Sequence, residues 1–71
     1  MEAAQKILQY LRSKGITQRY LGRKAGIDAA ALSMSLNGKR KFTLDEYEAI
    51  CWVLGVNVDT FLEPKPPEKA S

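Results

Sequence analysis

The stretch GITQRYLGRKAGIDAAALSMSLNG, from Gly15 to Gly38, decides the fold because it contains two short helix-like segments separated by one turn. The unit GID, from Gly26 to Asp28, lies at its centre. Glycine tolerates the left-handed conformation that ends a helix, and aspartate accepts a free backbone N–H at the start of the next helix. Similar units stand at Gly15 to Thr17 and at Gly55 to Asn57, so each one predicts a boundary between two helices.

Apolar residues around these boundaries support the same division. The residue before each predicted N-cap is apolar, and so is the residue five positions further on, which is the spacing of a hydrophobic staple. The pairs are Ile16 with Leu21, Ile27 with Leu32, and Val56 with Phe61. A fourth boundary has the capping-box pattern Thr43 with Glu46, and there the staple pairs Phe42 with Tyr47.

These signals predict an all-α domain over residues 1–62 with five helices and no strand. The helices are expected at Glu2–Lys14, Gln18–Ala25, Ala29–Asn37, Leu44–Leu54 and Val58–Leu62. Apolar residues at helical spacing predict one core, formed by Ala4, Ile7, Leu8, Leu11, Leu21, Ala25, Leu32, Leu36, Leu44, Tyr47, Ile50, Cys51 and Leu54. Residues 63–71, EPKPPEKAS, carry too little apolar surface to order themselves, so a flexible C-terminal tail is expected.

The composition excludes several classes of function. The 71 residues include no histidine and one cysteine, Cys51, so zinc sites and Cys/His or Ser/His catalytic pairs lack their parts. We therefore expect no enzyme activity, no metal and no cofactor. With no apolar run near the roughly 20 residues that cross a bilayer, and with one unpaired cysteine, the chain is expected to be cytoplasmic and not bound to a membrane. Cys51 itself is expected to be a small core residue.

Charge divides the chain into two parts. Residues 1–42 carry nine Lys or Arg against two acidic residues, whereas residues 43–71 carry two Lys against six. One reading is an ordinary solvated surface, but a basic first part with an acidic remainder favours a polyanionic partner. Two helices of two to three turns joined at a glycine are also the layout of a helix-turn-helix unit, although that layout alone is a weak signal.

Gly15 to Leu62 resembles the Cro/repressor (XRE-type) helix-turn-helix family. The agreement includes Thr17-Gln18, Leu21, the small residue Gly22, Ala25-Gly26-Ile27, Ser33, Asn37-Gly38-Lys39-Arg40 and Leu54-Gly55-Val56. The resemblance implies a compact five-helix, lambda-repressor-like domain whose second and third helices form the helix-turn-helix. It also implies a regulator of transcription that binds double-stranded operator DNA, usually as a two-fold dimer. Such a protein is expected in a prokaryotic nucleoid or to be encoded by a phage or plasmid.

Two clusters are predicted to hold DNA phosphates. Thr17, Gln18 and Arg19 open a helix whose free N–H groups and dipole favour an anion. The second cluster is the basic loop with Asn37, Lys39, Arg40 and Lys41. Such contacts position a protein on DNA without reading its sequence. The alternatives are a plain N-cap at Thr17 and an ordinary solvated loop.

Base reading is implied at the exposed face near the start of the third helix, which by the resemblance falls on Ala29, Ala30, Ser33 and Met34. Long amide or guanidinium side chains are absent there, so bidentate pairing with adenine or guanine cannot occur from these positions. Methyl and thioether groups can pack on thymine methyls, which predicts T-rich contacted positions with a large share of shape readout. The alternative is that Ala29 and Ala30 only favour the helix.

Two further departures concern the core and a partner. The resembling domains often pair an arginine in the first helix with a glutamate in the third, where this chain has Leu11 and Leu36, and an apolar pair can replace a buried ion pair without loss of stability. Trp52 falls where the resembling domains usually have a polar residue. One reading is that it only covers a loop; the other, with Val56 and Val58, predicts a homodimer interface. A protein-interaction module of the same fold, antitoxin-like or an adaptor with weak or lost DNA reading, is the alternative function.

Overall fold

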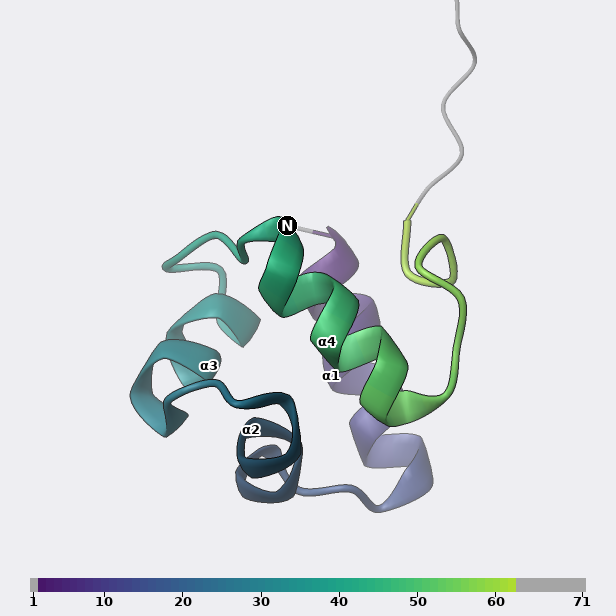
Figure 1. Cartoon of the computed structure of the whole chain (residues 1–71), viewed down its shortest axis with the longest axis horizontal. Coiled ribbons are helices and arrows are strands. Elements are labelled where there is room, and N and C mark those ends of the chain that lie inside the picture. Colours follow the sequence, from purple (N-terminus) through teal and green to yellow (C-terminus); the bar gives the residue numbers. More distant parts are fainter. Residues whose placement is uncertain (1, 63–71) are drawn as a thin grey trace, which may run out of the picture.

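The computed structural model describes residues 2–62, which form four α-helices around one core (Figure 1). The helices are α1 (Glu2–Lys14), α2 (Gln18–Ala25), α3 (Ala29–Leu36) and α4 (Leu44–Leu54). Residues 2–62 contain no strand, as predicted. α2 packs against both α3 and α4, and α1 packs against α3. The tail predicted at residues 63–71 lies outside the described residues.

The predicted N-caps are confirmed at the starts of α2, α3 and α4. The hydroxyl of Thr17 accepts the N–H of Tyr20 at 3.0 Å, and the carboxylate of Asp28 accepts the N–H groups of Ala30 and Ala31 at the start of α3. Thr43 and Glu46 form the predicted capping box at the start of α4. These bonds satisfy N–H groups that have no partner inside the helix, which is why the three helices begin where they do.

The fifth predicted helix, Val58–Leu62, is wrong. These residues form consecutive turns, in which Thr60 donates to the carbonyl of Asn57 at 3.0 Å and Leu62 donates to that of Asp59 at 3.2 Å. Both bonds span three residues, whereas an α-helix needs bonds that span four, and so short a segment is a poor helix nucleus. The apolar side of the segment still reaches the core, because Phe61 is buried with its ring edge-on to Tyr10. The third helix is also one residue shorter than predicted, since Asn37 is its C-cap.

The core is otherwise close to the predicted one. Leu11 and Leu36, at 2% and 3% exposure, belong to the same apolar cluster, which is consistent with an apolar replacement for a buried ion pair. Cys51 is buried as a small core residue, as predicted. Leu44 is a wrong assignment, because it is the first residue of α4 and is 70% exposed.

Gly22 is the place where α2 comes closest to the turn and α3. A Cβ atom on Gly22 would lie 3.0 Å from the carbonyl oxygen of Ile27 and 3.3 Å from the Cδ2 atom of Leu32. The N–H of Ile27 also donates to the carbonyl of Gly22 at 2.9 Å. Any side chain at this position would crowd backbone atoms, which explains the small residue in the pattern.

Candidate nucleic-acid interface

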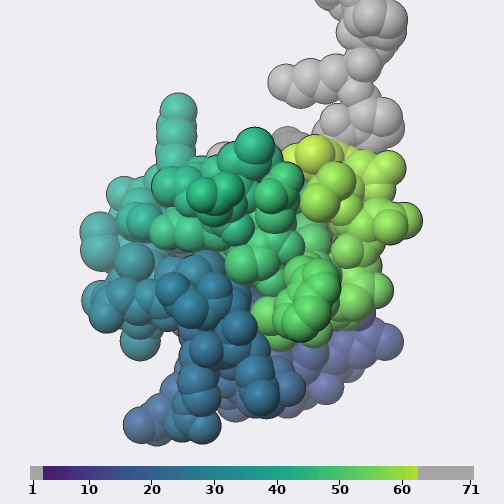
Figure 2. Space-filling view, in the orientation of Figure 1, coloured from purple at the N-terminus to yellow at the C-terminus, as the bar shows by residue number. Residues whose placement is uncertain are grey.

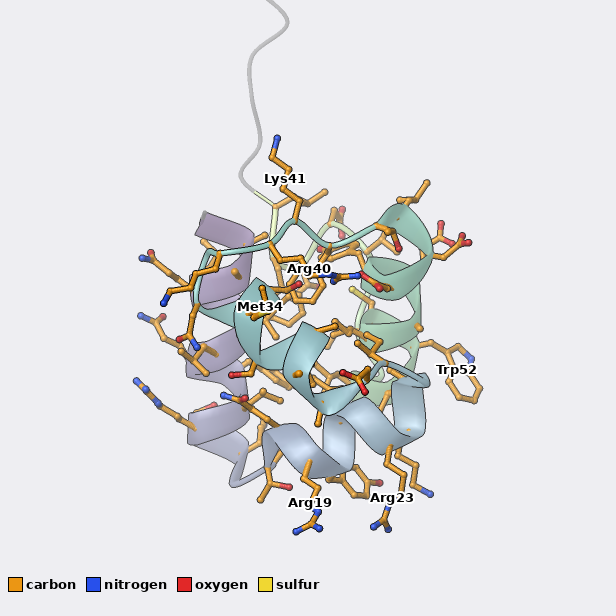
Figure 3. The ribbon with its side chains drawn as sticks, turned by 90° about the vertical axis from the view of Figure 1, so that its left-hand side faces the viewer. Arg19, Arg23, Met34, Arg40, Lys41 and Trp52 are labelled. Carbon is orange, nitrogen blue, oxygen red and sulfur yellow. The ribbon has the colours of Figure 1, made fainter. Side chains whose placement is uncertain are left out.

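The outer face of α3 carries the four predicted base-reading residues. Ala29 and Ala30 are exposed, Met34 is 46% exposed, and Ser33 is half-buried beside Asn37. Positions 29, 30, 33 and 34 share one side of a helix, whereas Leu32, Ser35 and Leu36 turn to the core. Figure 3 looks onto α3 from its exposed side, with α1 and α4 on either side of it and α2 below it.

The start of α2, which lies below α3 in Figure 3, carries the first predicted phosphate cluster. Thr17 caps the helix with its hydroxyl, Gln18 is half-buried and Arg19 is exposed. Figure 3 shows Arg19 and Arg23 pointing away from the body in the same direction. Arg23, which was not among the predicted contacts, shares this side of α2 because it follows Arg19 at i, i+4 spacing.

The loop between α3 and α4 carries the second predicted cluster. Asn37 caps α3, and the N–H of Lys39 donates to the carbonyl of Met34 at 2.8 Å, so the loop leaves the helix through a tight turn. Lys39 and Lys41 are exposed, and Lys41 points away from the molecule (Figure 3). The loop therefore places two cations beside the outer face of α3.

Arg40 differs from its two neighbours because its guanidinium turns inward to α4 (Figure 3). Its Nη1 donates to the Ser35 hydroxyl at 2.8 Å and to Glu46 Oε1 at 3.0 Å, while Nη2 lies 2.8 Å from Glu46 Oε2. Hydrogen bonds from Arg40 and then from the Thr43 backbone lower the pKa of Glu46 to about 2. Arg40 is one of the phosphate contacts predicted from the sequence, and in the structure it has two internal partners, Ser35 and Glu46.

The α4 side of the molecule has exposed apolar side chains, with Glu48 and Asp59 beside them. Trp52 is 82% exposed and projects from α4 away from α3 (Figure 3). It lines a shallow hollow together with Cys51, Val56 and Val58, so the three residues predicted for a dimer interface lie together. Exposed Leu44 and Leu62 line a neighbouring hollow with Phe42 and Val58. In Figure 2, residues 44–62 form the front and right of the molecule, whereas residues 18–42 form its left and lower parts.

Tyr47 holds α4 to the segment after it, and Cys51 is a second buried titratable group on the same helix. The Tyr47 hydroxyl donates a short hydrogen bond to the carbonyl of Val58, and burial raises the pKa of Tyr47 to about 12. Burial also raises the pKa of the Cys51 thiol. Both groups are therefore held in their neutral forms near pH 7, which suits a packing role.

Among residues 2–62, no three His, Cys, Asp or Glu side chains lie together as metal ligands would. In the same part of the chain, no helix has the length and apolar character to span a bilayer.

Comparison with known proteins gives one result. The helix-turn-helix family model matches residues 4–61, which include all four helices except the first two residues of α1. No curated protein and no solved structure matches the chain.

Proposed function

This chain belongs to the Cro/repressor-type (XRE) helix-turn-helix family, whose members are DNA-binding regulators, and we therefore propose that it is a sequence-specific transcriptional regulator, most simply a repressor. In this proposal α3 enters the major groove of double-stranded DNA. A helix is about 10 to 12 Å across, which fits a groove about 12 Å wide. We propose that the protein works in the cytoplasm by binding and not by catalysis.

The observation that carries the proposal is the arrangement of side chains around α3. Its outer face has only short or flexible side chains, Ala29, Ala30, Ser33 and Met34, so the helix backbone can approach the base edges closely. Exposed cations stand on both sides of it, Arg19 on α2 and Lys39 and Lys41 in the loop. Cations on either side of a helix face with short side chains are suited to a major groove that has one sugar-phosphate backbone along each edge.

Within the groove, the proposed contacts are mainly apolar. The methyl groups of Ala29 and Ala30 and the thioether of Met34 would pack on thymine C5-methyl groups, and Ser33 would donate to or accept from several base edges. Because these contacts discriminate less than bidentate pairs, the shape and stiffness of the DNA would contribute a large part of the specificity.

On the backbone, the proposed phosphate contacts are the start of α2 and the basic loop. They are Thr17, Gln18, Arg19, Asn37, Lys39 and Lys41, while Arg40, the seventh residue predicted from the sequence, has the internal partners described above. If four to six phosphates are neutralised per subunit, log K against log salt should have a slope of roughly −4 to −5.

We further propose a homodimer that uses Trp52, Val56 and Val58. An exposed tryptophan beside a hollow is the kind of residue that contributes most at interfaces. Two subunits related by a two-fold axis would place their recognition helices about 34 Å apart and would read a near-palindromic site.

The alternative is a protein-interaction module of the same fold, antitoxin-like or an adaptor. Two observations favour it: α3 lacks long readers, and Trp52 presents a large apolar side chain to a partner. In that case the exposed face of α4 would be the functional surface, and α3 would be a structural helix with weak or lost DNA reading.

Selection of bound duplexes from a random library distinguishes the two functions. The full chain should recover T-rich sites in two half-sites one helical turn apart, and binding should fall steeply with salt. A consensus dominated by guanines opposite α3 would contradict the proposed reading mode. Absence of duplex binding at low salt would leave the interaction module as the function.

A further inference from the structure

We propose that Arg40 is a positioning residue, which with Glu46 and Ser35 forms a clamp that holds the loop between α3 and α4 and presents Lys39 and Lys41 to DNA. In this assignment Arg40 does not itself bind phosphate. The inference rests on the proposed DNA binding. It makes Lys39 and Lys41 the phosphate contacts of the loop and Arg40 the residue that positions them.

The clamp joins three elements of the fold. Ser35 comes from α3 and is 1% exposed, Arg40 comes from the loop, and Glu46 comes from the first turn of α4. Both terminal nitrogens of the guanidinium and both carboxylate oxygens are used, at 2.8 to 3.0 Å. The Oε1 atom of Glu46 also accepts the N–H of Thr43 at 3.0 Å. A bidentate pair of this kind fixes orientation as well as distance, because both groups are planar.

The clamp acts on the middle of the loop. The beginning of the loop is tied to α3 by the N–H of Lys39, which donates to Met34, and its end is tied to α4 by the N–H of Thr43. Arg40 connects the part between these ties to both helices at once. Without it, the loop could swing about its two ends while α3 and α4 stayed folded.

The orientation of Arg40 determines that of its neighbours. Figure 3 shows Arg40 pointing to α4 and Lys41 pointing away from the molecule. The Arg40 side chain keeps 30% of its surface exposed, but three of its four Nη–H donors are bonded to Ser35 and Glu46. A phosphate contact that used these three donors would have to break the bidentate pair, whereas Lys39 and Lys41 are exposed and can reach DNA without breaking an ion pair of this kind.

This role predicts a result that net charge alone would not. Removing an acidic residue should strengthen binding to a polyanion, because it makes the protein more positive. If Glu46 holds the clamp, Glu46→Gln instead weakens binding. Glutamine keeps the shape of the side chain and can still complete a capping box with Thr43, so α4 retains its N-terminus.

Asp45→Asn and Glu48→Gln are matched controls. Both remove one negative charge from exposed positions of α4 outside the clamp. They should leave DNA affinity unchanged or raise it by up to about twofold, which measures the effect of charge alone.

The test compares the full chain and its variants on the duplex that the library selection recovers, over a series of salt concentrations. Glu46→Gln and Arg40→Gln should each weaken binding by about fivefold or more, and the double variant should be no weaker than either one, since both break the same pair. The salt slope of Glu46→Gln should become shallower by up to about 1.8, because two lysine contacts are lost. Tighter binding by Glu46→Gln than by the wild type, with weaker binding by Arg40→Gln, would overturn the inference and make Arg40 a phosphate contact.

A second measurement needs no DNA. Backbone ¹⁵N relaxation of residues 38–42 should report a rigid loop in the wild type and in Asp45→Asn, and a mobile loop in Glu46→Gln. A loop that stays rigid in Glu46→Gln would overturn the clamp. If the wild type binds no duplex, the proposed function fails and the DNA role of the loop fails with it, while the relaxation data still decide whether the clamp exists.

Discussion

The α3 side and the α4 side of this molecule are built on one core but have opposite chemistry. On the α3 side, short side chains such as Ala29 and Ala30 form the centre and long cations stand at the edges. On the α4 side, large apolar side chains such as Trp52 and Leu44 are exposed in the centre, and the charges around them are carboxylates. The α3 side is suited to the proposed polyanion and the α4 side to the proposed apolar partner, so in this proposal each side binds a different partner.

Because both surfaces pack on the same core, the position of a substitution decides whether it affects one surface or both. Leu32 and Leu36 anchor α3, and Ile50 and Cys51 anchor α4, in one cluster of buried residues. Exposed substitutions should therefore affect one side only, whereas a core substitution should affect both. The following predictions test that separation, beginning with the largest effect.

Leu11→Arg should destabilise the domain by about 3 kcal/mol or more, because it buries an unpaired charge beside Leu36. Because the whole domain would unfold, duplex binding by the α3 side and association through the α4 side should be lost together. Thermal denaturation and duplex binding would measure the effect. Gln9→Arg adds the same charge at an exposed position of α1 and serves as the control. Melting of Leu11→Arg close to that of the wild type would refute the idea that an apolar pair replaces an ion pair here.

Gly22→Val should destabilise the fold by about 2 kcal/mol, because the added side chain crowds the carbonyl of Ile27 and the side chain of Leu32. Duplex binding should be weakened more than self-association, because α2 and α3 would be forced apart while α4 keeps its place. Gly22→Ala should cost less, because a gain in helix propensity of about 1 kcal/mol offsets part of the crowding. Equal melting temperatures for Gly22→Val and the wild type would argue against this close approach.

Trp52→Ala should raise the dissociation constant of the proposed homodimer tenfold or more, about 1.4 kcal/mol. The stability of the monomer should hardly change, because the side chain is 82% exposed. Sedimentation equilibrium measures the first effect and denaturant titration of dilute protein the second. Tyr20→Ala removes an exposed aromatic ring from α2 and should leave association as it is. A Trp52→Ala dimer as tight as the wild type would move the interface elsewhere.

Lys39→Ala with Lys41→Ala should make the salt slope of duplex binding shallower by about 1.8 and should leave self-association unaffected. The two lysines are exposed, so folding should also be unaffected. Lys14→Ala with Lys6→Ala removes the same charge from α1 and controls for the net charge of the protein. An equal loss in both double variants would mean that charge alone, and not the loop, governs binding.

Local signals predicted much of this fold. The caps at Thr17, Asp28 and Thr43 were predicted correctly because each depends on hydrogen bonds within three residues of the chain. The Val58–Leu62 segment was predicted wrongly as a helix because a cap signal and an apolar partner do not reveal whether the bonds that follow span three residues or four. Leu44 fits the apolar spacing of α4, but its position at the first residue of the helix leaves it exposed beyond the core.

The amino-acid sequence by itself determined where the helices of the helix-turn-helix begin and, to within one residue, where they end, and it placed the cations and the short side chains in neighbouring segments. Those features follow from backbone conformations and hydrogen bonds between residues a few positions apart. Only the tertiary structure decided the direction of Arg40, because its partners Ser35 and Glu46 lie on two different helices and meet only when the loop and both helices are packed. The same holds for the exposure of Trp52, which depends on what the neighbouring segments leave uncovered and not on the tryptophan itself.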